Sequence, residues 1–267
     1  MSFRFIALFS CLVSTSTLIG ADLQVREGFP PPFYSTIQSA IEDAEEGDNV
    51  LVFPGTYNEI INFLGKDITV RGIGPLASLH KIDGSGDGSQ INGSLVVFDN
   101  GESSSARLEN FTITNGSASE GSGCYIGNQS SATIQNCVFS NCSSSSGGAV
   151  YVDGTSEAAI FVDVQFVNNS AGMSGGAVDI YNSQVRLEGC SFENCWLDRR
   201  ITAGTQIIGG GAISTYGSDS DSSLEIEGCS FSNCYVLGES ENNSNNSSTA
   251  TTYIQGGAVR AHGGNQS

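Results

Sequence analysis

The sequence has few charged side chains for its length. Charged residues make up 14% of the 267 residues, whereas glycine occurs 34 times. Helical bundles and doubly wound enzymes carry many Lys, Glu and Arg residues on their helix surfaces, so this composition argues against both classes. Many small polar residues with few charges are typical of stacked β-structure with tight turns.

Basic residues are especially scarce. Ten Lys and Arg residues stand against 28 Asp and Glu residues, which gives a formal net charge of −18. A negative field repels phosphate backbones and anionic lipid surfaces, so the charge excludes nucleic acid as a partner and disfavours docking on a membrane.

Long hydrophobic runs are also missing beyond the N-terminus, where no stretch approaches the roughly 18 apolar residues of a membrane helix. Residues 1–21 predict a secretory signal peptide, because a short basic segment with Arg4 precedes an apolar run at residues 5–13 and a small-residue cleavage site ends at Ala21. The alternative is a buried N-terminal strand. We therefore expect a secreted, extracellular or cell-surface protein with no transmembrane segment in the mature chain.

An internal repeat is the strongest signal in the chain. Five segments read apolar, any, Asn/Asp/Gly, apolar, any, apolar, any, Asn, and they are residues 108–115, 134–141, 161–168, 187–194 and 226–233. A Gly-Gly-Ala-Val/Ile motif alternates with them at residues 147–150, 175–178, 210–213 and 256–259. Inserted residues fall between each closing Asn and the next Gly-Gly pair.

The repeat offsets predict a parallel β-helix with three short strands per turn. Apolar positions spaced by two share one face of a strand, and the recurring Asn, Asp or Gly supplies a bend, because these residues tolerate left-handed backbone. Stacked turns about 4.8 Å apart would then pile one set of phenylalanines in a single interior column. That set is Phe139, Phe166, Phe192 and Phe231. The closing Asn residues would stack in the same way, with their amides hydrogen-bonded along the stack. A sandwich of short strands is the alternative, but it does not explain the constant offset of the bend.

The N-terminal part predicts a cap on this coil. Residues 35–38 form a capping box before an amphipathic helix, and Gly47 is a stop signal. A helix at the end of a solenoid covers its exposed edge. The predicted organisation is therefore a cap with the first turns at residues 22–72 and β-helix repeats at residues 73–267, the last turn being incomplete.

Two stretches of these motifs resemble known families. Residues 34–72 are similar to the N-terminal cap of secreted pectin-lyase-like right-handed β-helix proteins, and residues 166–178 resemble the Gly-Gly-Ala-Ile/Val repeats of polymorphic outer membrane proteins. The resemblance implies an all-β, right-handed, single-stranded parallel β-helix with an N-terminal capping α-helix. It implies little about function, because this fold is shared by lyases, esterases, epimerases, adhesins and plain stalks.

The strand after each Gly-Gly pair places alternate residues on an outer face. Aromatic rings stack on sugars, and carboxylates or Arg bind hydroxyls or uronates, so this face is a candidate carbohydrate-binding surface. The ligand-binding candidates are Tyr151, Asp153, Asp179, Tyr181, Tyr216, Arg260 and His262. The alternative is an ordinary solvated strand surface.

An enzyme would use the same face. Asp153 and Asp179 are one turn and two residues apart, which allows a paired-carboxylate hydrolase, and Arg260 is the only base there for a lyase. No metal-ligand spacing, nucleophile elbow or phosphate loop is present in the sequence. We expect no cofactor and no metal, calcium being an option only for the lyase alternative, and we assign no catalytic residue.

The cysteines have a structural interpretation. Of eight cysteines, Cys11 lies in the signal peptide, so seven remain in an oxidising compartment and at least one is unpaired. Cys190 and Cys229 hold equivalent positions in consecutive turns, as do Cys195 and Cys234. Stacked positions are within disulfide range, so both pairs are disulfide candidates. The alternative is that they serve as small apolar core residues.

Together these patterns predict a secreted or cell-surface, non-catalytic stalk or adhesin that binds a carbohydrate or other cell-surface ligand on its outer strand face. The alternative function is a polysaccharide-active enzyme, such as a pectate-lyase-like lyase, a glycoside hydrolase or an epimerase.

Overall fold

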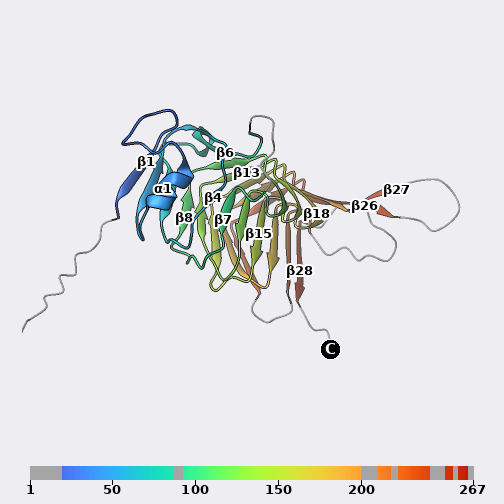
Figure 1. Cartoon of the computed structure of the whole chain (residues 1–267). Coiled ribbons are helices and arrows are strands. Elements are labelled where there is room, and N and C mark those ends of the chain that lie inside the picture. The colour runs from blue at the N-terminus through green and yellow to red at the C-terminus, as the bar shows by residue number, and fades with distance from the viewer. Residues whose placement is uncertain are drawn as a thin grey trace, which may run out of the picture.

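A computed structural model describes residues 20–86, 93–199, 210–217, 222–240, 250–254 and 258–263. Nearly all of the predicted signal peptide lies outside these ranges. The described chain winds into a right-handed parallel β-helix whose strands stack into four sheets, with α1 (Ile37–Asp43) at the N-terminal end (Figure 1). The predicted fold class and the capping helix are confirmed.

The four sheets, named here A to D, contain the strands that follow. Sheet A stacks β1 (Asp22–Val25), β2 (Asn49–Val52), β5 (Thr69–Gly72), β8 (Arg107–Glu109), β12 (Thr133–Gln135), β16 (Ala159–Val162), β20 (Gln184–Glu188) and β24 (Ser223–Glu227). Sheet B stacks β3 (Gly55–Tyr57), β6 (His80–Asp83), β9 (Thr112–Thr114), β13 (Val138–Ser140), β17 (Gln165–Val167), β21 (Ser191–Glu193) and β25 (Ser230–Ser232). Sheet C stacks β4 (Ile61–Asn62), β7 (Val96–Phe98), β11 (Cys124–Ile126), β15 (Val150–Asp153), β19 (Val178–Tyr181), β23 (Ile213–Gly217) and β28 (Val259–Gly263). Sheet D stacks β10 (Ser117–Glu120), β14 (Ser143–Ser146), β18 (Ser170–Ser174), β22 (Trp196–Arg199), β26 (Tyr235–Ser240) and β27 (Ala250–Ile254).

The prediction of three strands per turn holds for the first two turns, β2–β3–β4 and β5–β6–β7. It is wrong from β8 on, where the chain passes through sheets A, B, D and C in that order. Sheet D is made from the segments between each closing Asn and the next Gly-Gly pair, which the repeat had marked only as a place for insertions. The first three of these strands, β10, β14 and β18, are rich in Ser and Ala. Strands β10 to β26 pair in parallel from turn to turn, as Ser117 does with Ser143, whereas β27 pairs antiparallel with β26.

The phenylalanine column is confirmed. The rings of Phe139, Phe166, Phe192 and Phe231 stack with centroids 5.4, 4.6 and 4.8 Å apart, and their planes differ by 10° or less. The first three rings are fully buried, so each turn contributes one large side chain to a continuous core.

The bends follow the predicted offset. Asn110, Asn136, Asp163 and Gly189 connect sheets A and B with φ between 51° and 66°. The closing Asn residues form a second left-handed bend, with φ of 54° at Asn141. The predicted stack of closing amides is only partly seen, because the buried amide that bridges two turns is that of Asn169, the residue directly after the closing Asn168. Asn169 Nδ2 donates to the Phe139 carbonyl at 2.9 Å, and its Oδ1 accepts from the Cys142 N–H at 3.0 Å.

The cap differs from the predicted capping box in detail. Thr36 is the N-cap, and its hydroxyl accepts from the Ser39 N–H at 3.2 Å. Glu59, in the loop between β3 and β4, accepts from the N–H groups of Ile37 and Gln38 at 2.9 and 3.0 Å, so its carboxylate satisfies two donors of the first helical turn. Lys66 Nζ donates to three carbonyls at the other end of α1.

The described cysteines are free thiols in the structure. Cys190 and Cys229 lie one turn apart as expected, with the Cys190 N–H donating to the Cys229 Sγ at 3.3 Å. Cys195 and Cys234 also face each other, and this neighbour together with burial raises the pKa of the Cys195 thiol. The disulfide pairings are not formed in the structure and stay a prediction.

Within the described ranges, no helix is long and apolar enough to cross a membrane.

Candidate functional site

The outer surface of sheet C, called the C-face here, carries the side chains predicted to bind a ligand. Register places Tyr125, Tyr151, Asp179 and Ser214 in one column along the stack. A second column holds Asp153, Tyr181 and Tyr216. Arg260 and His262 continue these two columns on β28, but their side chains lie outside the described part of the structure.

Two of the residues expected to face solvent are buried. Asp179 is 0% exposed and Tyr151 only 7% exposed. The reason is sheet D, which meets sheet C at a tight corner. Gly147 turns this corner with φ of +60°, and a Cβ placed on it would lie 3.1 Å from the Asp179 Cβ. Such a close approach leaves no room for solvent above the carboxyl group.

Asp179 is held in this corner by hydroxyl groups. The Ser174 hydroxyl on β18 donates to Oδ2, and the Tyr216 hydroxyl donates to the same oxygen at 3.4 Å. Oδ1 is buried without a hydrogen-bond partner in the described part of the chain. Burial raises the pKa of Asp179 to about 6, and the two hydroxyl hydrogen bonds offset only part of this effect. Burial also raises the pKa of Tyr216 to about 12.

Asp153 and Asp179, the predicted carboxylate pair of a hydrolase, therefore cannot both contact a substrate in this conformation. Asp153 lies beside Tyr181 and is partly exposed, whereas Asp179 lies beside Tyr151 and is closed off from solvent. A catalytic carboxyl must reach the substrate. In this conformation Asp179 links sheets C and D, and only Asp153 is open to a ligand.

The tyrosines of the C-face lie in pairs on consecutive turns, and Tyr125, Tyr181 and Tyr216 are half-buried whereas Tyr151 is buried. The rings of Tyr181 and Tyr216 lie 5.1 Å apart at 46°. Those of Tyr125 and Tyr151 are stacked at 6.1 Å and 18°. Each ring is fixed on a strand that is paired on both sides, so the rings form a rigid strip along the coil.

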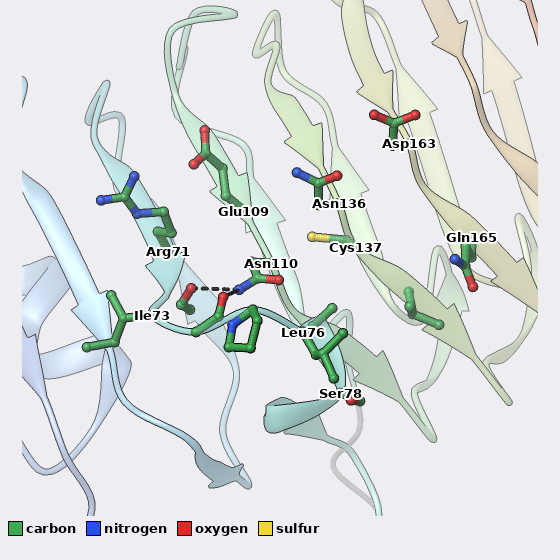
Figure 2. A pocket seen from close by; sticks show the side chains of 15 residues that line it. Arg71, Ile73, Leu76, Ser78, Glu109, Asn110, Asn136, Cys137, Asp163 and Gln165 are labelled. Atoms are coloured by element: carbon green, nitrogen blue, oxygen red, sulfur yellow. Dashed lines mark hydrogen bonds between the residues drawn. The ribbon is translucent and has the colours of Figure 1, made fainter.

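A second candidate site, called the corner groove here, was not predicted. It is an open hollow of about 860 Å³ at the bend between sheets A and B (Figure 2). Its floor comes from successive turns, and its rim is the segment 72–78, which includes part of η1 (Ala77–Leu79). Asn110 ties this rim to the floor, because its Nδ2 donates to the carbonyls of Gly72 and Gly74 at 2.8 and 2.9 Å.

The polar side chains of the corner groove are of two kinds. Glu109 is neutralised by Arg107 at 2.7 Å, and Arg107 also donates to Gln135 at 2.8 Å. The other kind is exposed, and these side chains have no hydrogen bond or ion pair within the described ranges. They are Arg71, Asn136, Asp163 and Gln165. The repeat had identified Asn136 and Asp163 only as bend residues. Their constant offset nevertheless means that they line up along the coil, and this was the signal that could have revealed the groove.

The described residues contain no cluster of three or more His, Cys, Asp or Glu side chains suited to a metal ion.

Comparison with known proteins gives one family and distant structural likenesses. No curated protein sequence matches the chain. One similar solved structure is a pectin methylesterase in complex with a hexasaccharide, at 16% identity and a TM-score of 0.39, covering 81% of this chain and 67% of that one. Another is a mutant pectin methylesterase, also in complex with a hexasaccharide, at 14% identity and a TM-score of 0.35, covering 93% and 90%. Both likenesses are too distant to support a statement about activity. The resemblance to polymorphic outer membrane protein repeats stays a prediction. The family model described as "Right handed beta helix region" matches residues 94–266, and the chain therefore belongs to the right-handed β-helix family.

Proposed function

We propose that the chain is a secreted or cell-surface, non-catalytic β-helix protein that binds a glycan on its C-face. The observation that carries this proposal is the pair of half-exposed rings of Tyr181 and Tyr216, 5.1 Å apart on consecutive turns, with Asp153 in the same column. Aromatic rings pack on the C–H faces of sugars, and a carboxylate accepts hydrogen bonds from sugar hydroxyls.

The rigidity of this surface favours binding. Side chains on paired strands lose little freedom when a ligand arrives, so less of the interaction free energy is spent on ordering. The formal charge of −18 favours a neutral glycan over an acidic one, because a polyanion would be repelled by the whole chain.

A polysaccharide-active enzyme is the second candidate, and one observation favours it. Asp179 has its pKa raised to about 6, which is the range of a general acid at neutral pH. The same carboxyl is fully buried beneath the corner of sheets C and D. Catalysis would therefore require this corner to open around the substrate.

The test is binding to an array of neutral and uronate oligosaccharides, combined with an assay for products released from the bound glycans. Tyr181→Ala removes one ring and should weaken binding about threefold to tenfold, whereas Tyr181→Phe should bind like the original protein. Tyr235→Ala, which removes a half-exposed ring from sheet D, is the matched control. Product formation that disappears in Asp179→Asn would support the enzyme instead. Equal binding by the Tyr181→Ala and Tyr235→Ala variants would rule out the C-face.

A further inference from the structure

The corner groove combines free polar groups in an arrangement that the fold itself does not need. Arg71 on β5 and the bend residues Asn136 and Asp163 lie on three different turns, and Gln165 follows on β17 (Figure 2). Their side chains make no hydrogen bond or ion pair in the described chain, whereas the neighbouring Arg107 binds both Glu109 and Gln135. We propose that the corner groove is a separate binding site for a neutral, hydroxyl-rich oligosaccharide.

The groove presents its polar groups in a fixed geometry. Asn136 and Asp163 sit at bends with φ of 51° and 52°, and the strands on either side of each bend are paired with neighbouring turns. Amide and carboxylate groups each offer two hydrogen-bonding atoms in one plane, which suits adjacent hydroxyls on a sugar ring. Stacked turns repeat this arrangement about every 4.8 Å along the coil, so the groove suits a chain of linked units.

The rim supplies an apolar contact. Leu76 is 58% exposed, and Pro75 and Ile73 lie beside it in the same rim segment. Asn110 holds this segment over the floor through its two bonds to Gly72 and Gly74. A polar floor beneath an apolar rim matches the two kinds of surface on a sugar ring, which are its hydroxyl edge and its C–H faces.

The charges of the groove select a neutral ligand. Arg71 and Asp163 are one cation and one anion, and Glu109 is compensated by Arg107 at 2.7 Å. No excess positive charge is therefore available among these described residues for a polyuronate or a sulfated chain. The overall charge of −18 would add repulsion.

An extended peptide is a poorer match. A peptide commonly adds to the open edge of a sheet through backbone hydrogen bonds. Strands β12 and β13 on the groove floor already have a parallel partner on both sides, so they offer no such edge. Recognition must come from side chains, and those present are suited to hydroxyls.

The corner groove and the C-face lie on different walls of the coil. From β8 on, the chain runs through sheets A, B, D and C in each turn, and the groove spans the bend from A to B. The inference therefore does not rest on the proposed function of the C-face, and each site can be removed without altering the other.

The chain itself suggests variants that keep the fold. Later turns carry glycine at the bend position of Asn136 and Asp163, namely Gly189 and Gly228, and serine at the position of Gln165. A combined Asn136→Gly, Asp163→Gly and Gln165→Ser variant thus gives the middle turns the sequence of the later ones. Asn141→Gly with Asn168→Gly, which changes exposed bend residues between sheets B and D, is the matched control.

The experiment is binding to an array of neutral, uronate and sulfated oligosaccharides, followed by titration with the strongest neutral hit. The groove variant should bind that neutral oligosaccharide at least about tenfold more weakly than the original protein, because three side chains that hydrogen-bond it are lost. The control variant should retain this binding, and Tyr181→Ala should weaken only the separate binding event on the C-face and leave binding in the corner groove unchanged. Thermal unfolding of the groove variant and the control at similar temperatures shows that the fold is kept.

The inference is overturned if the groove variant and the control bind the neutral oligosaccharides equally well, or if the original protein binds only charged glycans or none. Loss of all binding in Tyr181→Ala alone would leave the C-face as the binding site and remove the groove. Loss in the groove variant alone would keep the groove and remove the C-face.

Discussion

The buried Asp179 makes the stability of the β-helix depend on pH in an unusual direction. Burial raises its pKa from the usual 3.8 to about 6 in the folded protein. An Asp whose folded pKa lies above its unfolded pKa holds its proton more tightly when folded, so protonation stabilises the fold. The stabilisation is complete below about pH 3.8, and it is lost as the pH rises through about 6.

The size of the effect follows from the same two pKa values. A difference of about two pKa units corresponds to about 3 kcal/mol in full, of which about 1 kcal/mol is gained between pH 7.5 and pH 5. For a chain of this size, 1 kcal/mol moves the unfolding midpoint by about 2–4 °C. Acidification from pH 7.5 to pH 5 should therefore raise the midpoint by about this amount through Asp179 alone.

The assay is thermal or urea unfolding of the original protein and two variants across this pH range. Asp179→Asn removes the titrating group and should lose the gain at pH 5, while being more stable than the original protein at pH 7.5. Glu193→Gln removes the same charge from an exposed strand position and corrects for the general relief of repulsion in a chain of charge −18. The reasoning is refuted if Asp179→Asn keeps the same pH dependence as Glu193→Gln.

Three further predictions concern the coil itself. Phe166→Ala should lower the free energy of unfolding by about 3–5 kcal/mol in denaturant titrations, because it empties the middle of the ring column, whereas Phe231→Ala at its less buried end should cost less. Under oxidising conditions, non-reducing peptide mapping should recover a Cys195–Cys234 disulfide, and finding only free thiols in the folded protein would contradict the pairing. Asp163→Ala should be about 1–2 kcal/mol less stable than Asp163→Gly, since φ of 52° is costly for alanine, and equal midpoints would show that the bend carries no such strain.

The stacking of the coil could be predicted because its signals repeat. In each copy of the repeat, two apolar residues are spaced by two positions, and the bend residue comes directly before the first of them. Because every copy has the same spacing, each one supports the same prediction. The phenylalanine column and the positive φ at Asn110, Asn136 and Asp163 follow from this regularity. If the pattern of one turn is misinterpreted, the patterns of the neighbouring turns still predict the correct stacking.

Sheet D could not be predicted because its sequence carries no such periodicity. Segments such as Ser143–Ser146 show no alternation of apolar and polar residues, and their pairing depends on the turns above and below. The position of sheet D decides the burial of the C-face. Period two correctly placed Asp179 outside the core, and a neighbouring sheet then covered it.

The corner groove escaped prediction for a different reason. Its floor is periodic, but its rim is a single excursion at residues 72–78 that is held by Asn110, 36 and 38 positions away from the carbonyls it binds. Contacts of this range leave no local pattern. Asn110 has the left-handed backbone that its bend requires, and this role could be predicted from the repeat. Its side-chain amide also binds the Gly72 and Gly74 carbonyls, and this contact is seen only in the folded chain.

The burial of Asp179 is also what separates the two functional candidates. A general acid needs both a raised pKa and contact with the substrate. The corner of sheets C and D raises the pKa of Asp179 by burying the carboxyl group, and the same burial prevents contact with a substrate. Ser174 and Tyr216 donate to the same oxygen of this carboxyl from two different sheets, so the arrangement joins the sheets. Opening the corner to a substrate would break this link and rehydrate the carboxyl, which would return its pKa toward the ordinary range and remove the property that suggests catalysis. The raised pKa is therefore better explained by the closed corner than by a catalytic role, and this favours binding on the exposed tyrosines.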